Sequence, residues 1–168
     1  MYRFRIILCC FLVALTCAAR AQDLPPLTGP VVLTVTGLDV AAFPGGKLEL
    51  DVPMLQAIGA TRFTTSTIWT EGSHVYTGVL LKNLQDRIKS GDHALKFIAL
   101  NDYSVEIPAQ DISDDAPMLA YAMDDAPMSV REKGPLWVLY PFDADAKYRT
   151  DTTFSRSIWQ LDRIEVLK

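Results

Sequence analysis

The thiol groups of this chain all lie at its start, at Cys9, Cys10 and Cys17. Thiolates serve as nucleophiles, as redox pairs and as ligands of zinc and iron–sulfur clusters. The stretch that holds the three cysteines has the pattern of a signal peptide. We therefore expect a mature protein without cysteine, in which thiolate chemistry and disulfide bonds are both excluded.

His74 and His93 are the only histidines of the chain, and they lie on different segments. A zinc site needs three or four suitable ligands, and no spacing of His and Glu residues here offers them. A Gly-x-Ser-x-Gly motif for an exposed serine nucleophile is also missing. The sequence thus argues against a protein-ligated metal and against a Ser-His-Asp hydrolase.

Residues 1–21 have the three parts of a secretory signal: Arg3 and Arg5, an apolar run over 6–15, and a small-x-small site that ends at Ala21. We expect cleavage after Ala21. Lipidation at Cys17 is the alternative, but the preceding Thr16 is larger than the residue normally found there. The apolar run is about half of the ~20 residues that a spanning helix needs. These features predict a soluble, exported protein without membrane insertion, periplasmic in a cell with two membranes.

Removal of the leader changes the charge balance of the chain. The whole chain has 16 Lys and Arg and 20 Asp and Glu residues, and the leader contains three of the arginines. The mature chain therefore has 13 basic and 20 acidic residues, a net charge of −7. Nucleic acids and anionic membranes are bound through clustered Lys and Arg, so both are poor partners for this protein.

Apolar patterning and turn residues predict a domain rich in short strands over residues 22–168. Asp51 is expected to cap a helix over 52–58, and apolar residues at helical spacing predict a second helix over 79–88. Residues 143–155 are expected to form an exposed, charged loop. Strands are expected over 31–36, 47–50, 62–69, 96–100, 103–107, 118–123, 136–140 and 158–167. This succession indicates a single domain with a mixed, β-rich α+β fold.

Six short segments follow one another in a familiar order. They are VTGL at 35–38, YTGVLLKNL at 76–84, LNDYSVEIP at 100–108, LAY at 119–121, GPLW at 134–137 and IWQLDRIEV at 158–166. In this order and spacing, the chain resembles the molybdopterin-binding domain of the sulfite oxidase superfamily over nearly its whole mature length. The resemblance implies a mixed-sheet α+β domain with a central pocket for a pterin, which in the enzymes carries molybdenum held by one protein cysteine.

The chain departs from the family pattern where the enzymes hold the metal. The cysteine position falls within residues 63–66, where hydroxyl side chains occur instead, and a hydroxyl is a poor ligand for a soft metal site. The family also has an arginine near the position of Trp137. In size, leader and missing ligand, the chain is most similar to small exported members that bind a pterin and control a membrane-bound cyclic-di-GMP enzyme through its periplasmic region.

If the ligand is a pterin, its site needs an aromatic face for stacking, a carboxylate for the guanidine-like edge, and hydroxyls or amides for the ring carbonyl. Trp69 is a candidate for stacking, although a tryptophan at a strand end can equally belong to the core. Thr65 and Thr67 can hydrogen-bond the ring or simply favour a strand.

Three further candidates complete the predicted site. Asp102 can bind the ring edge, or it can cap its own turn. Arg156 can bind a phosphate or the polyol side chain, or it can be a surface arginine in a salt bridge. Tyr140, just before Pro141, can line the mouth of the pocket. Trp137 and Trp159 lie in apolar runs and are expected in the core.

Three functions fit these observations. The first is a non-catalytic periplasmic receptor for a pterin, whose loaded form docks on a membrane sensor or cyclic-di-GMP enzyme. The second is an oxidoreductase that holds molybdopterin or the molybdenum cofactor without a protein thiolate, and the missing cysteine argues against it. The third is an interaction domain without a ligand, and the hydroxyl run beside Trp69 argues against it.

Overall fold

The computed structural model describes residues 24–168. The expected signal peptide, its three cysteines and the cleavage after Ala21 therefore lie outside the described residues. In the described part of the chain, no helix is long and apolar enough to cross a membrane.

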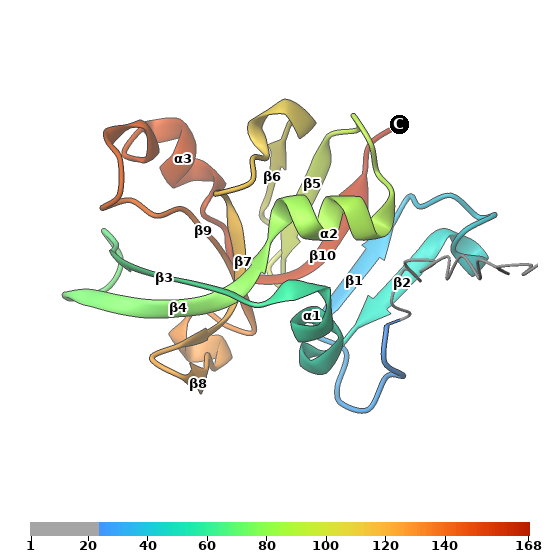
Figure 1. Ribbon diagram of the computed structural model, residues 1–168, viewed down its shortest axis with the longest axis horizontal. Coiled ribbons are helices and arrows are strands. Elements are labelled where there is room, and N and C mark those ends of the chain that lie inside the picture. The colour runs from blue at the N-terminus through green and yellow to red at the C-terminus, as the bar shows by residue number, and fades with distance from the viewer. Residues whose placement is uncertain (1–23) are drawn as a thin grey trace, which may run out of the picture.

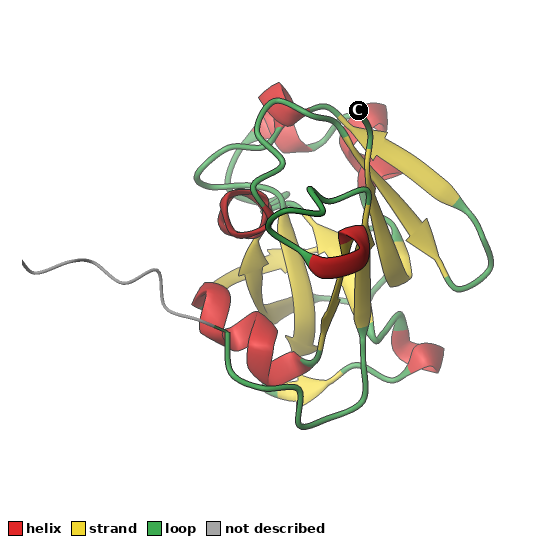
Figure 2. Cartoon of the chain, turned by 90° about the vertical axis from the view of Figure 1, so that its right-hand side faces the viewer, coloured by secondary structure: helices red, strands yellow, loops and turns green. Residues whose placement is uncertain are grey.

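One mixed ten-stranded sheet forms the centre of the molecule, with helices and turns around it (Figure 2). Its main path runs in the order β2-β1-β10-β9-β7-β4-β3, while β5 and β6 extend it from β10, and β8 pairs with β7. The strands are β1 (Leu33–Thr36), β2 (Lys47–Leu50), β3 (Thr61–Ser66), β4 (Ser73–Leu80), β5 (Leu95–Ala99), β6 (Ser104–Ile107), β7 (Met118–Met123), β8 (Ala126–Pro127), β9 (Leu136–Leu139) and β10 (Trp159–Val166).

Strand β10 connects the parts of this sheet. Its first residues pair with β9, and its later residues lie between β1 and β5. The β1–β10 pair is parallel, whereas the other pairs are antiparallel. β10 therefore joins the first and last segments of the described chain in one sheet, which is the architecture of a single mixed α+β domain.

Three α-helices lie against the sheet, and four short 3-10 helices lie in its connections, within the described residues. They are η1 (Pro44–Gly46), α1 (Val52–Gly59), α2 (Leu81–Ile88), η2 (Ala109–Asp111), η3 (Val130–Glu132), η4 (Ala146–Tyr148) and α3 (Asp151–Arg156). Helices α1 and α2 contact each other and both contact β4 (Figure 1). The side chain of Asp51 caps α1 by accepting the N–H of Met54, and it also accepts the N–H groups of Thr28 and Gly29.

The core lies where the sheet meets these helices. Its largest fully buried side chains include Trp137, Tyr76 and Phe97. Trp137 is thus a core residue, as the sequence predicts.

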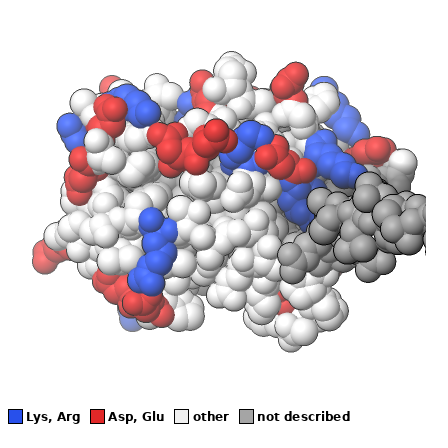
Figure 3. Space-filling view, viewed as in Figure 1, with Lys and Arg blue, Asp and Glu red and all other residues white. Residues whose placement is uncertain are grey.

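The face of the molecule seen in Figure 3 has acidic and basic side chains interspersed along its upper half.

The strand expected over 62–69 ends earlier, at Ser66, and two further segments differ from the sequence-based expectation. Val79 and Leu80 end the long strand β4 and do not begin a helix, because their pairing with β7 outweighs their helical spacing with Leu84. Residues 143–155 were expected to be a loop, but they contain η4 and most of α3. α3 forms because Thr150 and Thr153 cap its start reciprocally.

Candidate ligand-binding pocket

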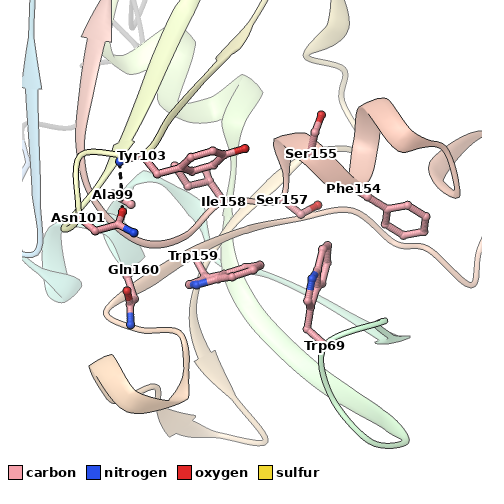
Figure 4. A pocket seen from close by; sticks show the side chains of 10 residues that line it. All are labelled: Trp69, Ala99, Asn101, Tyr103, Phe154, Ser155, Ser157, Ile158, Trp159 and Gln160. Carbon is pink, nitrogen blue, oxygen red and sulfur yellow. Dashed lines mark hydrogen bonds between the residues drawn. The ribbon is translucent and has the colours of Figure 1, made fainter.

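The clearest candidate site is a pocket of about 360 Å³ between the β3–β4 loop, the β5–β6 turn, α3 and the start of β10 (Figure 4). This volume is at the lower end of the range for small-molecule sites. The lining residues are Trp69, Ala99, Asn101, Tyr103, Phe154, Ser155, Ser157, Ile158, Trp159 and Gln160. The pocket is therefore walled by aromatic rings and by side chains that carry amides and hydroxyls.

A bulge in β10 brings two of these side chains to the pocket. The register shifts between Trp159 and Leu161, where two steps along β10 match one step along β9. Gln160, the extra residue, has φ 53°, and its backbone N–H donates to the carbonyl of Lys133 at 2.9 Å. Because a bulge redirects the side chains around it, Trp159 and Gln160 line the pocket even though they lie in a central strand.

The β5–β6 turn provides the part of the wall next to Gln160. The Asn101 side chain accepts the backbone N–H of Tyr103 at 3.1 Å, and Asp102 takes a left-handed conformation with φ 64°. The backbone N–H of Leu100 donates to the carbonyl of Gln160 at 2.9 Å. This bond fixes the turn against the β10 bulge and so keeps Asn101 and Gln160 on one side of the pocket (Figure 4).

Trp69 lines the pocket while packed in an aromatic cluster. Its ring lies 5.5 Å from that of Trp159 and 5.9 Å from those of Trp137 and Phe154, centre to centre, in edge-to-face arrangements. Such pairs are worth about 0.5–1.5 kcal/mol beyond the apolar area that they bury. The cluster thus fixes the orientation of Trp69, and Trp69 and Trp159 form a corner against which a planar ring can pack.

The ammonium group of Lys133 lies 4.7 Å from the centre of the Trp159 ring. A cation at this distance from an indole is attracted by the negative potential of the ring face. Lys133 is not among the residues that line the pocket. It supports the Trp159 ring without placing its charge in the pocket wall.

The loop that carries Trp69 is held by its own hydroxyls and by His74. The Thr67 hydroxyl accepts the backbone N–H of Trp69 at 3.1 Å and pairs with the Thr70 hydroxyl at 2.8 Å. The two ring nitrogens of His74 lie 2.7 Å from the Asp124 carboxylate and 2.9 Å from the Glu71 carbonyl. The hydrogen bond to Asp124, followed by the bond to Glu71, raises the pKa of His74 above its ordinary value despite partial burial.

The hydroxyl run before this loop is bound within the protein. Thr65 is fully buried, and its hydroxyl accepts the backbone N–H of Asp143 and donates to the Ser66 carbonyl. The Asp143 carboxylate accepts the backbone N–H of Ser66 at 2.5 Å and its hydroxyl at 2.8 Å. These bonds lower the pKa of Asp143, with the Ser66 N–H as the largest cause. The segment 63–66, where the resemblance implies a metal ligand, thus binds β3 to the loop that contains Asp143.

Of the six site residues predicted from the sequence, only Trp69 lines the pocket. Thr65 lies in β3, and Thr67 lies at the start of the loop that carries Trp69. Neither threonine lines the pocket, and both have the contacts given above. The Asp102 carboxylate is exposed and pairs with Arg163 at 2.8 Å; Asp102 lies between the lining residues Asn101 and Tyr103 in sequence but is not itself a lining residue. The roles of these residues toward a ligand stay predictions.

Tyr140 and Arg156 lie close to each other, and neither is a lining residue of the pocket. Arg156 pairs with Asp111 at 2.9 Å. The Tyr140 hydroxyl is buried without a hydrogen-bond partner in the described part of the chain. Burial, offset in part by the positive charge of Arg156, raises the pKa of Tyr140 to about 12.

Sequence reasoning missed most of the pocket wall. Asn101 and Tyr103 flank the predicted Asp102 in a turn that the Asn-Asp pair marks clearly, so this signal was available. The sequence predicts Trp159 in the core because it lies in an apolar run, and the bulge that redirects it leaves no sequence signature. Phe154 and Ser155 lie on α3, which was expected to be a loop.

The lining side chains suit stacking and hydrogen bonding. They include no carboxylate, imidazole, amine or thiol, and nowhere among residues 24–168 do three His, Cys, Asp or Glu side chains gather closely enough to hold a metal ion. The lining fits a planar, uncharged ring that stacks on indole and hydrogen-bonds to amides. It does not fit a metal-bearing dithiolene that needs a protein thiolate, or a phosphate that needs a cation.

No protein-family model matches the chain, and no curated protein matches it either.

Proposed function

We propose that this protein is an exported, periplasmic pterin-binding protein with the sulfite-oxidase-like fold. In this proposal it is non-catalytic and signals to the periplasmic region of a membrane-bound cyclic-di-GMP enzyme. The observation that carries the proposal is the pocket itself, where Trp69, Trp159 and Tyr103 offer aromatic surface beside the amides of Asn101 and Gln160. A reduced or oxidised pterin is a flat ring with hydrogen-bonding edges, and this combination suits it.

The proposed partner gains support from the surface around the pocket. Seven large apolar side chains of the described residues are exposed, and four of them belong to pocket segments or contact them: Ile68, Leu100, Tyr103 and Val130. Ile68 follows Thr67 on the Trp69 loop, and the Val130 carbonyl accepts the Gln160 amide. Exposed apolar surface near a ligand site suits a protein that docks in its loaded form.

The first alternative function is that of a molybdopterin-dependent oxidoreductase. It is disfavoured because the hydroxyls of Thr65 and Ser66 are both bound to Asp143 and neither belongs to the pocket lining. The second alternative, an interaction domain without a ligand, is disfavoured by the open pocket, whose aromatic wall also includes amides and hydroxyls.

Native mass spectrometry on protein exported to the periplasm and purified without air tests the three functional hypotheses together. A metal-free pterin adduct is the expected result. A molybdenum-bearing adduct would favour the oxidoreductase, and a bare chain from a pterin-replete cell would favour the interaction domain.

A second test uses the Trp69 loop. Trp69→Ala should weaken pterin binding by about 1–3 kcal/mol, the range for aromatic stacking platforms. Ile68→Ala is the matched control, because Ile68 is on the same loop, exposed, and outside the pocket lining. Since Trp69 also packs in the aromatic cluster, circular dichroism must first show that the variant is folded. Unchanged affinity in a folded Trp69→Ala protein would remove Trp69 from the proposed site.

A further inference from the structure

The pocket lining holds polar groups but no charge. Its polar side chains are amides and hydroxyls, from Asn101, Tyr103, Ser155, Ser157 and Gln160. Most binding sites for phosphate esters offer Arg, Lys or a set of free backbone N–H groups. This lining offers no cationic side chain, so its chemistry is that of a site for an uncharged ligand.

The arginines next to the lining are neutralised by carboxylates. Arg156 lies between the lining residues Ser155 and Ser157, but its guanidinium binds Asp111 at 2.9 Å. Arg163 binds Asp102 at 2.8 Å and Asp162 at 3.0 Å, and it also donates to the Ala99 carbonyl. Each guanidinium therefore already has a carboxylate partner, and neither arginine is a lining residue.

The two amides of the wall are oriented by the protein. The oxygen of Asn101 accepts the Tyr103 N–H, which leaves the Asn101 NH₂ group to donate to a ligand. The Gln160 NH₂ group donates to the Val130 carbonyl at 2.8 Å, which leaves the Gln160 oxygen as an acceptor. A donor and an acceptor on the same side of the pocket match the C=O and N–H groups of a lactam edge.

The serines on the α3 side add only acceptors. The Ser155 hydroxyl donates to the Thr152 carbonyl and the Ser157 hydroxyl to the Thr153 carbonyl. Their remaining lone pairs can accept from hydroxyl or N–H groups of a ligand, but they repel an anion. A polyol side chain on the ligand suits this wall, and a phosphate does not.

From this arrangement we infer that the pocket selects the phosphate-free, uncharged form of its heterocycle, with the Asn101 NH₂ group donating to the ring carbonyl and the Gln160 oxygen accepting the ring N–H. The inference rests on the proposed pterin function and names the ligand class of the same site. Its physical basis is the cost of moving a phosphate dianion from water into a pocket without a cation, in a molecule with an acidic surface. Phosphate-bearing pterins, molybdopterin among them, are excluded on the same ground.

Binding of dihydroneopterin and of its monophosphate ester tests the inference. Both are titrated without air into the mature protein, with tryptophan fluorescence or calorimetry as the readout. We expect the ester to bind at least about tenfold more weakly, since the unpaired charge is not compensated. Equal affinities would overturn the inference and leave the proposed function standing. Binding of neither compound would overturn both.

Asn101→Asp tests the direction of the hydrogen bond. The aspartate keeps an oxygen for the Tyr103 N–H but replaces the NH₂ donor with a charged acceptor. We expect at least about a tenfold loss of dihydroneopterin affinity, because a donor is replaced by an acceptor. Unchanged or tighter binding would show that the ligand presents a donor to Asn101, and it would overturn this assignment.

Adding a cation should reduce the selectivity against the phosphate ester. Ser155 is an exposed lining residue on α3, so Ser155→Lys places an ammonium group at the pocket wall. We expect the preference for the unphosphorylated compound to fall about tenfold or more, since charge-assisted hydrogen bonds to phosphate are strong. Thr152→Lys adds the same charge to the same helix outside the lining and should change the preference much less. Equal effects of the two variants would contradict a local role of the lining.

Discussion

Gly78 is a position where no side chain fits. A Cβ atom there would lie 2.2 Å from the Leu119 carbonyl oxygen and 2.7 Å from the Ala120 Cα, on the neighbouring strand β7. Both are backbone atoms, so they cannot move aside without shifting the strand. The register of β4 against β7 also changes at this residue. The close approach of two backbones therefore depends on glycine.

We expect Gly78→Ala to lower the free energy of unfolding by about 3 kcal/mol or more, the upper range for overpacked sites. Gly72→Ala is the control, because Gly72 has a positive φ of 71° but nothing within 4 Å of its Cβ position. It should cost about 1–2 kcal/mol, from the left-handed backbone alone. Urea unfolding of both variants measures the difference. Equal losses would contradict the close strand contact.

His74 links the stability of the Trp69 loop to pH. Because the folded protein raises its pKa above 6.5, its stabilising contribution is complete below that unfolded value and is lost as pH rises through the folded pKa. We expect the free energy of unfolding to fall between about pH 6 and 8, over the range in which histidine titrates. The decline should be absent in His74→Gln, where the side chain cannot become charged.

His93→Gln is the matched control for this test, since His93 is the other histidine and is exposed. That variant should keep the decline with pH. An NMR titration of the His74 ring then measures its pKa directly. A value at or below 6.5 would contradict the role given to the Asp124 and Glu71 hydrogen bonds.

The elements of this fold differ in how well local sequence determines them. β2 and β7 have the predicted bounds, and α1 begins after its predicted Asp51 cap, because each has its signal within its own residues. β4 was missed because its strand form depends on pairing with β3 and with β7, a strand that is distant in sequence. The pocket depends on such distant pairings too. Trp69 was predicted from its neighbours, but Trp159 and Gln160 reach the pocket through a bulge that exists only when β9 pairs with β10.

Helix α3 shapes one side of the pocket, and its first turn depends on Thr150. The Thr150 hydroxyl accepts the Thr153 N–H at 3.2 Å, and the Thr153 hydroxyl accepts the Thr150 N–H at 3.1 Å. Thr150→Ala should lower the free energy of unfolding by about 1 kcal/mol, the usual cost of a lost N-cap. Because Phe154 and Ser155 lie on the same short helix, ligand affinity should fall as well.

Thr152→Ala is the control for α3, because Thr152 is exposed on the same helix and outside the pocket lining. Alanine favours a helix, so this variant should be neutral or slightly more stable. Chemical denaturation and ligand titration of both variants measure the two effects. A Thr150→Ala protein with normal stability would show that packing against the sheet, and not the capping box, holds α3.

At the scale of the whole molecule, four aspartates tie loops to the sheet and its helices. Asp51 binds the chain at Thr28 and Gly29, Asp124 binds β4 at Val75, and Asp143 binds β3 at Ser66. The fourth, Asp115, accepts the Ser113 and Tyr148 hydroxyls. Each carboxyl has a lowered pKa: Asp51 chiefly through the Thr28 N–H, Asp115 through Ser113, Asp124 through His74 and Asp143 through the Ser66 N–H.

These lowered pKa values predict the acid side of the stability profile. A carboxyl whose folded pKa lies below its unfolded value of 3.8 contributes stability that is complete above that value and is lost as pH falls through the folded pKa. We therefore expect a steep loss of stability below about pH 4, near the unfolded pKa of aspartate. Asp143→Asn should make this loss shallower, because one of the titrating groups is gone. Asp114→Asn, at an exposed position next to Asp115, should leave the slope unchanged. Urea unfolding at a series of pH values measures the slopes, and equal slopes in all three proteins would show that the Asp143 bonds to β3 do not contribute to folding.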